Sequence, residues 1–184
     1  GLSIRQKTAG NGLLKVYATA DQSNLVQEQF LIGIPEQTQT VGVKNNNRFI
    51  NTNWKGQLSA AWILKLGGSF THNTDNYTLG EIKLQDQLVG SHLKGLAIHE
   101  VNKKVHIRFG TEYFYKSFEQ TIYPGFGADS ILSYQDHKPA AFVEAEIYTS
   151  NKFAVKAGGR VEYSSYLERA NISPRLSMAY KIED

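Results

Sequence analysis

The sequence predicts an all-β fold, an antiparallel meander of about nine strands that forms part of a transmembrane β-barrel. Polar and apolar residues alternate with a period of two along most of the chain, and helical periodicity is almost absent. The expected connections between strands are long at one end and tight at the other. No apolar run approaches the roughly 18 residues of a membrane-spanning helix, which excludes a helical membrane protein but not a barrel of alternating strands.

Composition narrows the class of protein further. The chain has 184 residues, of which 41% are hydrophobic and 20% charged, so a disordered chain is excluded. The net charge of +3 is small and scattered, so we expect no nucleic-acid partner. Because there are no cysteines, disulfides, thiolate metal sites and cysteine nucleophiles are excluded. The first residues are neither a start methionine nor a signal peptide, so we expect a processed chain or a fragment.

Each expected strand is half polar, with distinct faces. The strand expected over 153–166 shows this well, because Val155 and Val161 alternate with Lys156 and Glu162. The expected strands cover residues 12–20, 24–33, 47–58, 61–73, 91–101, 104–118, 138–149, 153–166 and 171–182.

The connections alternate in length. We expect tight turns near 21–23, 59–60, 102–103 and 150–152, long loops near 34–46, 74–90 and 119–137, and a short connection at 167–170. Outer-membrane barrels have short turns at one end and longer loops at the other. A soluble sandwich has no reason to keep that asymmetry.

Turn length predicts the register of two hairpins. If Asn102 and Lys103 form a two-residue turn, Ile98 lies opposite Ile107 and Leu96 opposite Phe109. His99 then lies opposite His106, and Lys94 lies on the lipid side opposite Thr111, where it must extend towards the interface. A three-residue turn at 150–152 places Ile147 opposite Val155 outside the barrel, and Glu146 opposite Lys156 inside it.

The inward side chains of the later strands predict a charged lattice on the wall of the lumen. A water-filled or plugged lumen tolerates such charges, whereas a dry sandwich core does not. The expected members are Arg108, Glu112, Glu144, Glu146, Lys156, Arg160 and Glu162.

External loops are the expected place for ligand binding. Aromatic side chains on such loops can stack on sugars or apolar ligands, and they can equally pack the loop or extend an interfacial girdle. The candidate ligand-binding residues are Tyr77, Tyr123, Phe126, Asp129 and Tyr134.

Other chemistries receive little support. Glu144 and Glu146 are neighbours on one strand and do not flank a bond, so salt bridges are expected rather than glycosidase catalysis. His99 and His106 have no third ligand, so we expect no metal. The segment Gly125–Ser130 lacks the last glycine and the following helix of a phosphate loop. We therefore expect no enzyme and no cofactor.

Pro174 lies within a strand pattern. Because proline cannot donate a backbone hydrogen bond, we expect a bulge or a backbone site without a hydrogen-bonding partner there.

Two segments of the last third resemble a known family. They are Ala157-Gly158-Gly159-Arg160-Val161-Glu162-Tyr163 and Asn171-Ile172-Ser173-Pro174-Arg175-Leu176-Ser177-Met178-Ala179-Tyr180-Lys181. They resemble TonB-dependent outer-membrane receptors, particularly those of Bacteroidetes, in which a strand of the form G-R-x-E leads into S-P-R-L-S-x-A-Y.

The resemblance implies a barrel of about 22 strands that holds a plug domain. It also implies location in the bacterial outer membrane and uptake of a scarce nutrient such as a metal chelate, cobalamin or a glycan, with energy supplied through TonB. The expected partners are outer-membrane lipid, the remaining barrel strands and plug of the same protein, and indirectly TonB. The sequence contains no recognisable plug, and residues 181–184 lack a terminal aromatic residue, so residues 1–184 are expected to be an internal slice of the barrel.

Two other interpretations remain open from the sequence. One is a small standalone outer-membrane barrel of eight to ten strands, which the odd strand count disfavours. The other is a soluble β-sandwich or barrel that binds a ligand, which the inward charges and the one-sided long loops disfavour.

Overall fold

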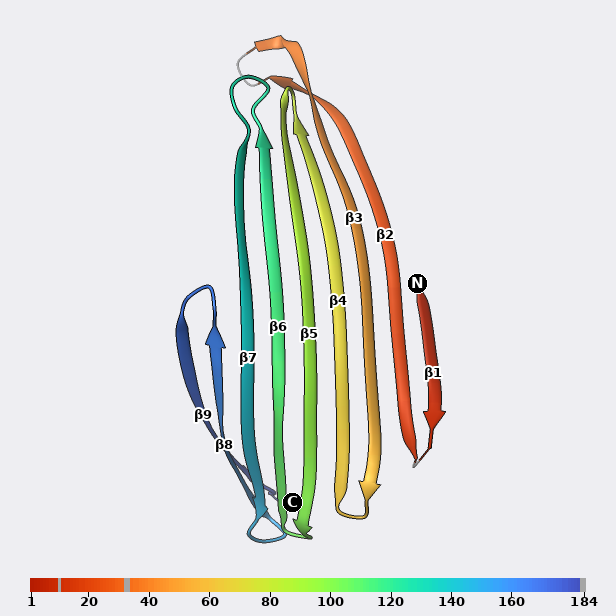
Figure 1. Cartoon of the computed structure of the whole chain (residues 1–184), viewed down its shortest axis with the longest axis vertical. Helices are drawn as coiled ribbons and strands as arrows, with labels where there is room; N and C mark the ends of the chain where they lie inside the picture. Colours follow the sequence, from red (N-terminus) through yellow and green to blue (C-terminus); the bar gives the residue numbers. More distant parts are fainter. Residues whose placement is uncertain (10, 32–33, 183–184) are drawn as a thin grey trace.

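The chain forms a single antiparallel sheet of nine strands in the computed structural model, which describes residues 1–9, 11–31 and 34–182 (Figure 1). The strands follow one another in chain order across the sheet, so the topology is a plain meander. They are β1 (Leu2–Thr8), β2 (Gly12–Leu31), β3 (Ile34–Ser59), β4 (Trp62–Leu79), β5 (Ile82–Asn102), β6 (Val105–Tyr123), β7 (Ser130–Tyr148), β8 (Phe153–Ser164) and β9 (Arg169–Tyr180).

The sheet is one layer thick, and it has no dry core. Apart from glycines, Ala140 is the only apolar residue that is buried in the described part of the chain. Leu176 and Leu93, in contrast, are well exposed. No ladder joins β1 to β9 within the described ranges, so the sheet is an open piece of wall with two free edges. This arrangement confirms the predicted all-β meander and excludes the sandwich alternative for these residues. No helix in the described part of the chain is long and apolar enough to cross a membrane.

Two of the predicted strand boundaries are wrong at the N-terminal side. The segment 21–23 is not a turn, because Asp21, Gln22 and Ser23 pair with Asn47, Asn46 and Asn45 in the middle of a continuous β2. The two strands predicted over 12–20 and 24–33 are therefore one strand, although residues 32 and 33 lie outside the described residues. The prediction also missed β1, which pairs with the first half of β2.

The predicted long loops are mostly strand. Residues 34–46 belong to β3, and β4 and β5 are joined by only Gly80 and Glu81, where Gly80 has a φ of 61°. The β6–β7 connection shrinks to residues 124–129. Backbone hydrogen bonds to the neighbouring strands stabilise these segments, although many of their side chains are polar and neither side of them is a continuous apolar face. The two ends of the sheet still differ, but the difference lies in strand length and not in loop length. Strands β2–β7 extend far beyond the β8–β9 hairpin at one end (Figure 1).

Strand register separates the sheet into two faces. Across β1–β9, one face carries a band of apolar side chains, and we call this face the apolar face. The band covers the half of the sheet nearest the turns at 60–61, 103–104 and 149–152, and we call these three the tight turns. Representative members on successive strands are Ile4, Val16, Trp54, Leu66, Leu93, Phe109, Val143, Val155 and Leu176. The opposite, polar face carries most of the charged side chains of that half.

A bulge at Val101 overturns the predicted register of the β5–β6 hairpin. Glu100 pairs with His106 and Asn102 with Val105, which leaves Val101 without an opposite residue. Every pair in the hairpin shifts by one residue, so Ile98 faces Arg108, Leu96 faces Gly110 and His99 faces Ile107. The extra residue reverses the face of every β5 side chain relative to β6. Lys94 therefore belongs to the polar face rather than to the lipid side.

The register predicted for the β7–β8 hairpin is confirmed, with Ile147 opposite Val155 and Glu146 opposite Lys156. Pro174 lies opposite Gly159 without any bulge. Lys181 donates its N–H to the carbonyl of Lys152, and because hydrogen-bonded pairs alternate along a ladder, the nitrogen of Pro174 faces away from β8. The missing donor thus falls at the open edge of β9, which is the free backbone site that the sequence predicted.

Candidate functional site

A charged lattice covers the polar face of β5–β8, with Glu112 at its centre. Lys94 Nζ lies 2.5 Å from Glu112 Oε1, and Arg160 Nη1 lies 2.5 Å from Glu112 Oε2. Only 8% of the Glu112 side chain is exposed, because the two cations cover it. Arg160 also donates from Nε to Glu162 Oε2 at 3.2 Å, so one guanidinium joins carboxylates of two strands.

The lattice continues towards the tight turns through Arg108. Its Nη2 lies 3.1 Å from Glu146 Oε2, and its Nη1 lies 3.5 Å from Glu144 Oε1. Lys156 Nζ approaches the same Glu144 oxygen at 2.9 Å, and the Tyr148 hydroxyl donates to Glu146 at 2.8 Å. Each carboxylate of this part therefore has a charged partner on a neighbouring strand, which stiffens the sheet across β6–β8.

All seven predicted lattice residues lie on this one face and take part in these ion pairs. The sequence analysis missed Lys94, because the bulge at Val101 was not foreseeable from the turn residues. With Lys94 included, the lattice balances four cations against four anions: Lys94, Arg108, Lys156 and Arg160 against Glu112, Glu144, Glu146 and Glu162. It therefore holds strands together and presents little net charge.

Asp136 ties the β8–β9 connection to β7 above the lattice. Ser164 donates to both carboxylate oxygens, at 2.9 and 3.1 Å, and the backbone N–H of Tyr166 donates at 3.2 Å. Lys138 Nζ lies 3.2 Å away, and the Asp136 side chain is only 8% exposed. Burial raises the pKa of Asp136, but the bonds from Tyr166 and Ser164 and the charge of Lys138 outweigh it and place the pKa below its usual value. The sequence analysis missed this residue because it assigned 119–137 to a loop.

A cavity of about 590 Å³ opens on the polar face beside Asp136. The rings of His92 and Phe114 stack in it with centroids 3.9 Å apart, and Phe49 lies across from them on β3. Lys116 and Lys138 line the same cavity. Asp136 and Glu162 line it too, and Lys138 is paired with Asp136, so the cavity offers aromatic faces for stacking beside groups of both charges.

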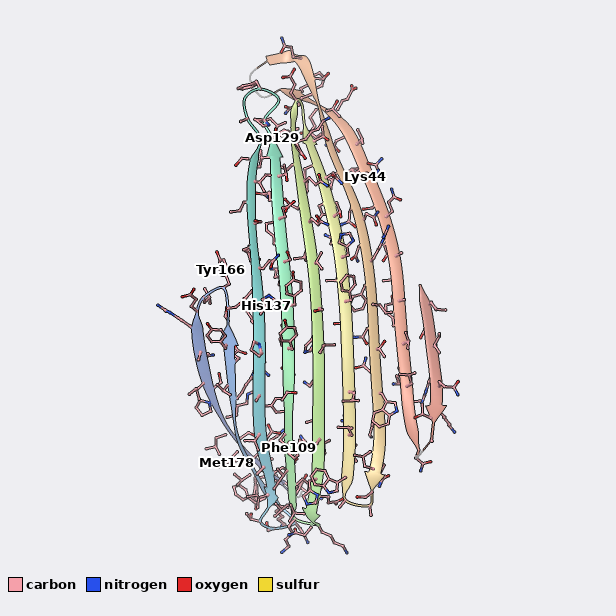
Figure 2. All side chains as sticks on the ribbon, viewed as in Figure 1. Lys44, Phe109, Asp129, His137, Tyr166 and Met178 are labelled. Atoms are coloured by element: carbon pink, nitrogen blue, oxygen red, sulfur yellow. The ribbon has the colours of Figure 1, made fainter. Side chains whose placement is uncertain are left out.

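The five predicted ligand-binding residues all lie in the half of the sheet beyond the β8–β9 hairpin, but they do not form one cluster. Asp129 lies in the 124–129 loop at the far end of the sheet (Figure 2). Phe126 belongs to the same loop and is 83% exposed. Tyr123 ends β6, and Tyr77 lies within β4 opposite Leu84. Burial, together with the carboxylates Asp75 and Asp86, raises the pKa of Tyr77.

Tyr134 lies in β7 and not in a loop. In β7 it packs with two other aromatic rings. Its ring is 5.6 Å from that of Phe118 and 5.2 Å from that of Tyr166, and Lys116 Nζ lies 5.5 Å from its centre. This group adjoins the 590 Å³ cavity through Lys116. Tyr134 is therefore better placed to contact a ligand in that cavity than are Tyr77 and Tyr123.

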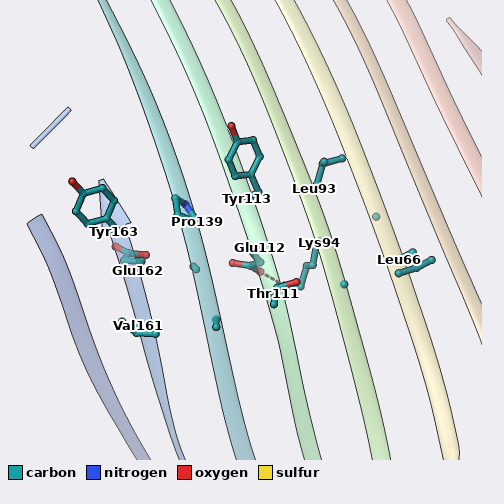
Figure 3. Close-up of a pocket in the computed structure, with 14 residues that line it drawn as sticks. Leu66, Leu93, Lys94, Thr111, Glu112, Tyr113, Pro139, Val161, Glu162 and Tyr163 are labelled. Carbon is teal, nitrogen blue, oxygen red and sulfur yellow. Dashed lines mark ion pairs between the residues drawn. The ribbon is translucent and has the colours of Figure 1, made fainter. Parts of the chain in front are cut away.

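The apolar face has its own hollow, of about 770 Å³, over β4–β8 (Figure 3). Most of the residues that line the hollow are apolar or aromatic, but Lys94, Glu112 and Glu162 line it too, and the first two form an ion pair there. Aromatic residues mark both ends of the apolar band. At one end Tyr113 Oη lies 2.6 Å from His137 Nδ1, and at the other the ring of Trp62 stacks on His99 at 4.2 Å. The apolar residues that line the hollow are Leu66, Leu93, Tyr113, Pro139, Val161 and Tyr163.

The structure separates the two histidines that the sequence had placed together. His99 lies on the apolar face against Trp62, whereas His106 lies on the polar face, 3.7 Å from Glu100. Among the described residues, no three histidine, cysteine or acidic side chains are grouped as a metal site requires. Gly125 and Gly127 have φ of 81° and 90° and form an open turn with no helix after it.

A two-faced meander with a charged lattice on one side and an aromatic-bordered apolar band on the other is the geometry of an outer-membrane barrel wall. The sequence matches the family described as TonB dependent receptor-like, beta-barrel, over residues 5–184. The chain belongs to this TonB-dependent receptor family. It is accordingly a protein of the bacterial outer membrane, and its apolar face is the one that suits lipid.

The likeness to one solved structure, FyuA, agrees with the assignment of the fold. The ferric yersiniabactin uptake receptor FyuA from Yersinia pestis matches with a TM-score of 0.68 at 11% identity, over 91% of this chain and 31% of FyuA. The outer membrane transporter YddB from Escherichia coli matches with a TM-score of 0.42 at 14% identity, over 96% of this chain and 35% of YddB. The chain thus spans about a third of the length of these proteins. No curated protein matches the sequence significantly.

Proposed function

We propose that residues 1–184 form part of the barrel wall of a TonB-dependent transporter that takes up a scarce nutrient. The observation that carries this proposal is the family match over residues 5–184 on a sheet whose two faces are suited to lipid and to an aqueous lumen. The wall itself is passive. It encloses the channel and presents ligand contacts, and it needs neither a catalytic residue nor a cofactor.

The charged lattice lines the lumen in this proposal. The residues are Arg108, Glu112, Glu144, Glu146, Lys156, Arg160 and Glu162, together with Lys94. Buried charges are tolerated where they are paired and hydrated, and a water-filled lumen supplies both conditions. The strands that extend beyond the apolar band then project from the outer surface of the membrane.

Ligand capture belongs to the outer end of the sheet. The cavity between Phe49, His92 and Phe114 offers aromatic faces, and Tyr134, whose ring contacts the lining residue Lys116, would extend the contact with the ligand. The exposed Phe126 would make an outer contact. Tyr77, Tyr123 and Asp129 would make outer contacts. Lys138 and Arg160 are paired with carboxylates, whereas Lys116 makes no ion pair with a described residue and so favours a ligand with some negative charge over a neutral glycan. FyuA is described as a ferric yersiniabactin uptake receptor, so a metal chelate is the first candidate, ahead of cobalamin and glycans.

We expect the remaining partners at the open edges of the sheet and on its polar inner face. The free edges of β1 and β9 would pair with the remaining barrel strands of the same protein, because unpaired edges are not tolerated in lipid. The inner face would enclose the plug domain, and the plug would connect the receptor to TonB.

Uptake by cells that produce the full-length receptor tests the proposal. We expect receptor-dependent accumulation of a radiolabelled metal chelate that disappears when the gene for TonB is deleted. Tyr134→Ala should weaken ligand binding by about three- to tenfold, the equivalent of one aromatic contact. The control Tyr180→Ala removes a ring at the opposite end, on the apolar face. Accumulation that is independent of the receptor for chelates, cobalamin and glycans alike would exclude the proposed transport role.

A further inference from the structure

A groove of about 450 Å³ lies on the polar face of β2–β5, in the half of the sheet nearest the tight turns. The groove is open above Gly67, which carries no side chain and lies opposite Asn53 on β3 and Lys94 on β5. Among the described residues, a Cβ atom added to Gly67 would meet only Asn53 Oδ1, at 3.1 Å, and the Thr52 carbonyl, at 3.8 Å. The charged and amide side chains that line the groove are Lys15, Lys55, Lys65, Lys94, Asn51 and Asn53.

Three of the four lysines in the groove lack an acidic partner. Lys94 is paired with Glu112 at 2.5 Å. Lys15, Lys55 and Lys65 are exposed, and none of them makes an ion pair with a described residue. Lys55 lies directly opposite Lys65, and like charges in such a pair destabilise a sheet. The groove therefore carries positive charge that the described part of the sheet does not neutralise.

The surface around the groove is basic as well. On β1, Arg5 lies opposite Lys15, and Lys7 follows two residues later on the same face. Among the described residues on the polar face of β1–β4, the acidic residue closest to the groove is Asp21. It lies six residues from Lys15 along β2, which is roughly 20 Å in an extended strand. Carboxylates of these strands therefore do not cancel the attraction of the groove for an anion.

The spacing of the cations indicates the charge of the ligand. Lys55 and Lys65 share one row of the face, and Lys15 belongs to the next row, because it lies opposite Asn53. Successive rows are about 7 Å apart, and neighbouring strands are about 4.8 Å apart. Lysine stems are flexible, so a ligand with two or more acidic groups can contact all three ammonium groups at once. A single carboxylate reaches fewer of them.

The amides in the groove add hydrogen-bond donors without charge. Asn53 Nδ2 donates to Asn51 Oδ1, whereas Asn51 Nδ2 donates to no described residue and is available to a ligand oxygen. Ion pairs on an open surface contribute little, but each becomes stronger in a recess that excludes part of the solvent. Free cations and a free amide in one groove together favour oxygen anions.

The groove adjoins the 590 Å³ cavity that we propose for ligand capture. Ser69 and His92 line both spaces, so the two are continuous along the face. Phe49 lines the cavity, and Lys55 lies six residues along β3 towards the tight turns, or roughly 20 Å in an extended strand. A ligand that leaves the cavity towards the tight turns therefore meets the groove next.

We propose that the groove is a second, inner binding site for a small polyanion that carries two or more carboxylate or phosphate groups. This inference rests on the proposed function, because it places the polar face in the lumen. It narrows the transported nutrient from chelates in general to chelates that expose several anionic groups. The groove would hold such a ligand during its passage, after first contact in the capture cavity.

Footprinting of lysines in the full-length receptor, purified in detergent, tests the site directly. The probes are citrate, a tricarboxylate, and pyrophosphate. At about ten times the Kd of the probe, mass action predicts about tenfold slower acetylation of Lys15, Lys55 and Lys65, measured by mass spectrometry. Lys103 and Lys104, exposed in the β5–β6 turn, should react equally fast with and without the probe.

The two probes distinguish the chemistry of the ligand. Protection by citrate alone identifies carboxylates as the preferred groups, and protection by pyrophosphate alone identifies phosphates. Either result supports the site. Unchanged acetylation of the three groove lysines with both probes would overturn the proposal, including the case in which another part of the receptor covers them.

Filling the groove supplies a second readout. Gly67→Leu places a side chain in the open space, and we expect it to abolish the protection by either probe. Gly68→Leu is the matched control, because it adds the same side chain one residue away on the apolar face, against the flexible end of Leu93. Protection that persists in folded Gly67→Leu would contradict the assignment of the site to this groove.

A charge-removing variant keeps the test independent of folding in Gly67→Leu. A heat-dependent shift in gel mobility shows whether each variant is folded. In Lys55→Gln with Lys65→Gln, we expect the affinity for the protecting probe to fall by about ten- to a hundredfold, through the loss of two charge-assisted contacts. Lys103→Gln with Lys104→Gln should leave the affinity unchanged, and an equal fall in both variants would contradict the site.

Uptake measurements separate this inference from the proposed function. If the probes protect the groove lysines but the receptor transports no nutrient, the groove binds polyanions and the transport role fails. If a chelate is taken up in a TonB-dependent manner but neither probe protects the lysines, the transport role stands and the inner site is excluded.

Discussion

Lys94 on β5 and Glu112 on β6 lie opposite one another in the sheet, and their charged atoms meet at 2.5 Å. Tyr148 donates its N–H to Lys104, so the even-numbered residues of β6 hydrogen-bond towards β7 and not towards β5. Lys94 and Glu112 therefore form a non-hydrogen-bonded pair, the type in which side chains approach most closely. The bulge at Val101 creates this pair, since without it Lys94 would lie on the lipid side.

The register at this pair can be tested with a disulfide. The chain has no cysteine, so a variant with Lys94→Cys and Glu112→Cys has one possible intramolecular bridge within this segment. We expect it to form on mild oxidation, because non-hydrogen-bonded pairs have a Cα separation of about 4.5 Å, within disulfide range. Lys94→Cys with Thr111→Cys, the pair of the register without a bulge, should remain reduced. Preferential oxidation of the second variant would contradict the bulge.

Removing the central carboxylate of the lattice should be costly. Glu112→Ala leaves Lys94 and Arg160 without their shared partner, and we expect the free energy of unfolding of the receptor to fall by about 3 kcal/mol. Glu162→Ala removes a more exposed carboxylate, 39% exposed, and should cost less than about 1 kcal/mol. Urea unfolding in lipid vesicles measures both values. Equal losses would show that Glu112 is not the centre of the lattice.

A charge placed on the apolar face should destabilise the barrel in lipid. Leu176 lies in the middle of the apolar band on β9, and Leu176→Arg should cost roughly 2–4 kcal/mol at mid-membrane depth. Ser177→Arg places the same side chain one residue away on the polar face, opposite Lys156, where like-charge repulsion should cost less than about 1 kcal/mol. Unfolding in vesicles compares the two variants, and a similar cost for both would contradict the assignment of the faces.

Acid should release the β8–β9 connection from β7. The pKa of Asp136 is lowered in the folded state, so its stabilising effect is complete above the unfolded-state value of about 3.9 and is lost as the pH falls through the folded-state value. We expect proteolysis of residues 165–168 by an acid-active protease to accelerate below about pH 4. In Asp136→Asn, which loses about 2 kcal/mol of local stability, cleavage should already be fast at pH 5. A pH-independent rate in the unsubstituted protein would exclude the role of Asp136.

The class of the fold, its meander topology and the charged face of β6–β8 could all be predicted from the amino-acid sequence alone. Alternation with a period of two is a local property that any half-buried strand must show, and the 150–152 turn sets a register that its residues alone reveal. The position of Glu144, Lys156 and Arg160 on one face could therefore be predicted from the sequence.

Pairing between distant strands, in contrast, sets where the polar segments join the sheet and which side chains meet. Asp21–Ser23 resembles a turn, yet it is strand because β3 supplies a hydrogen-bonding partner along its whole length. Lys94 joins the lattice because a single extra residue at Val101 shifts the register of β5 against β6. Arg5, Lys15, Lys55 and Lys65 lie close together on one face because distant segments of the chain pair in the sheet. A one-residue shift exchanges the two faces of a strand, and local sequence does not encode such a shift unless the partner strand is known.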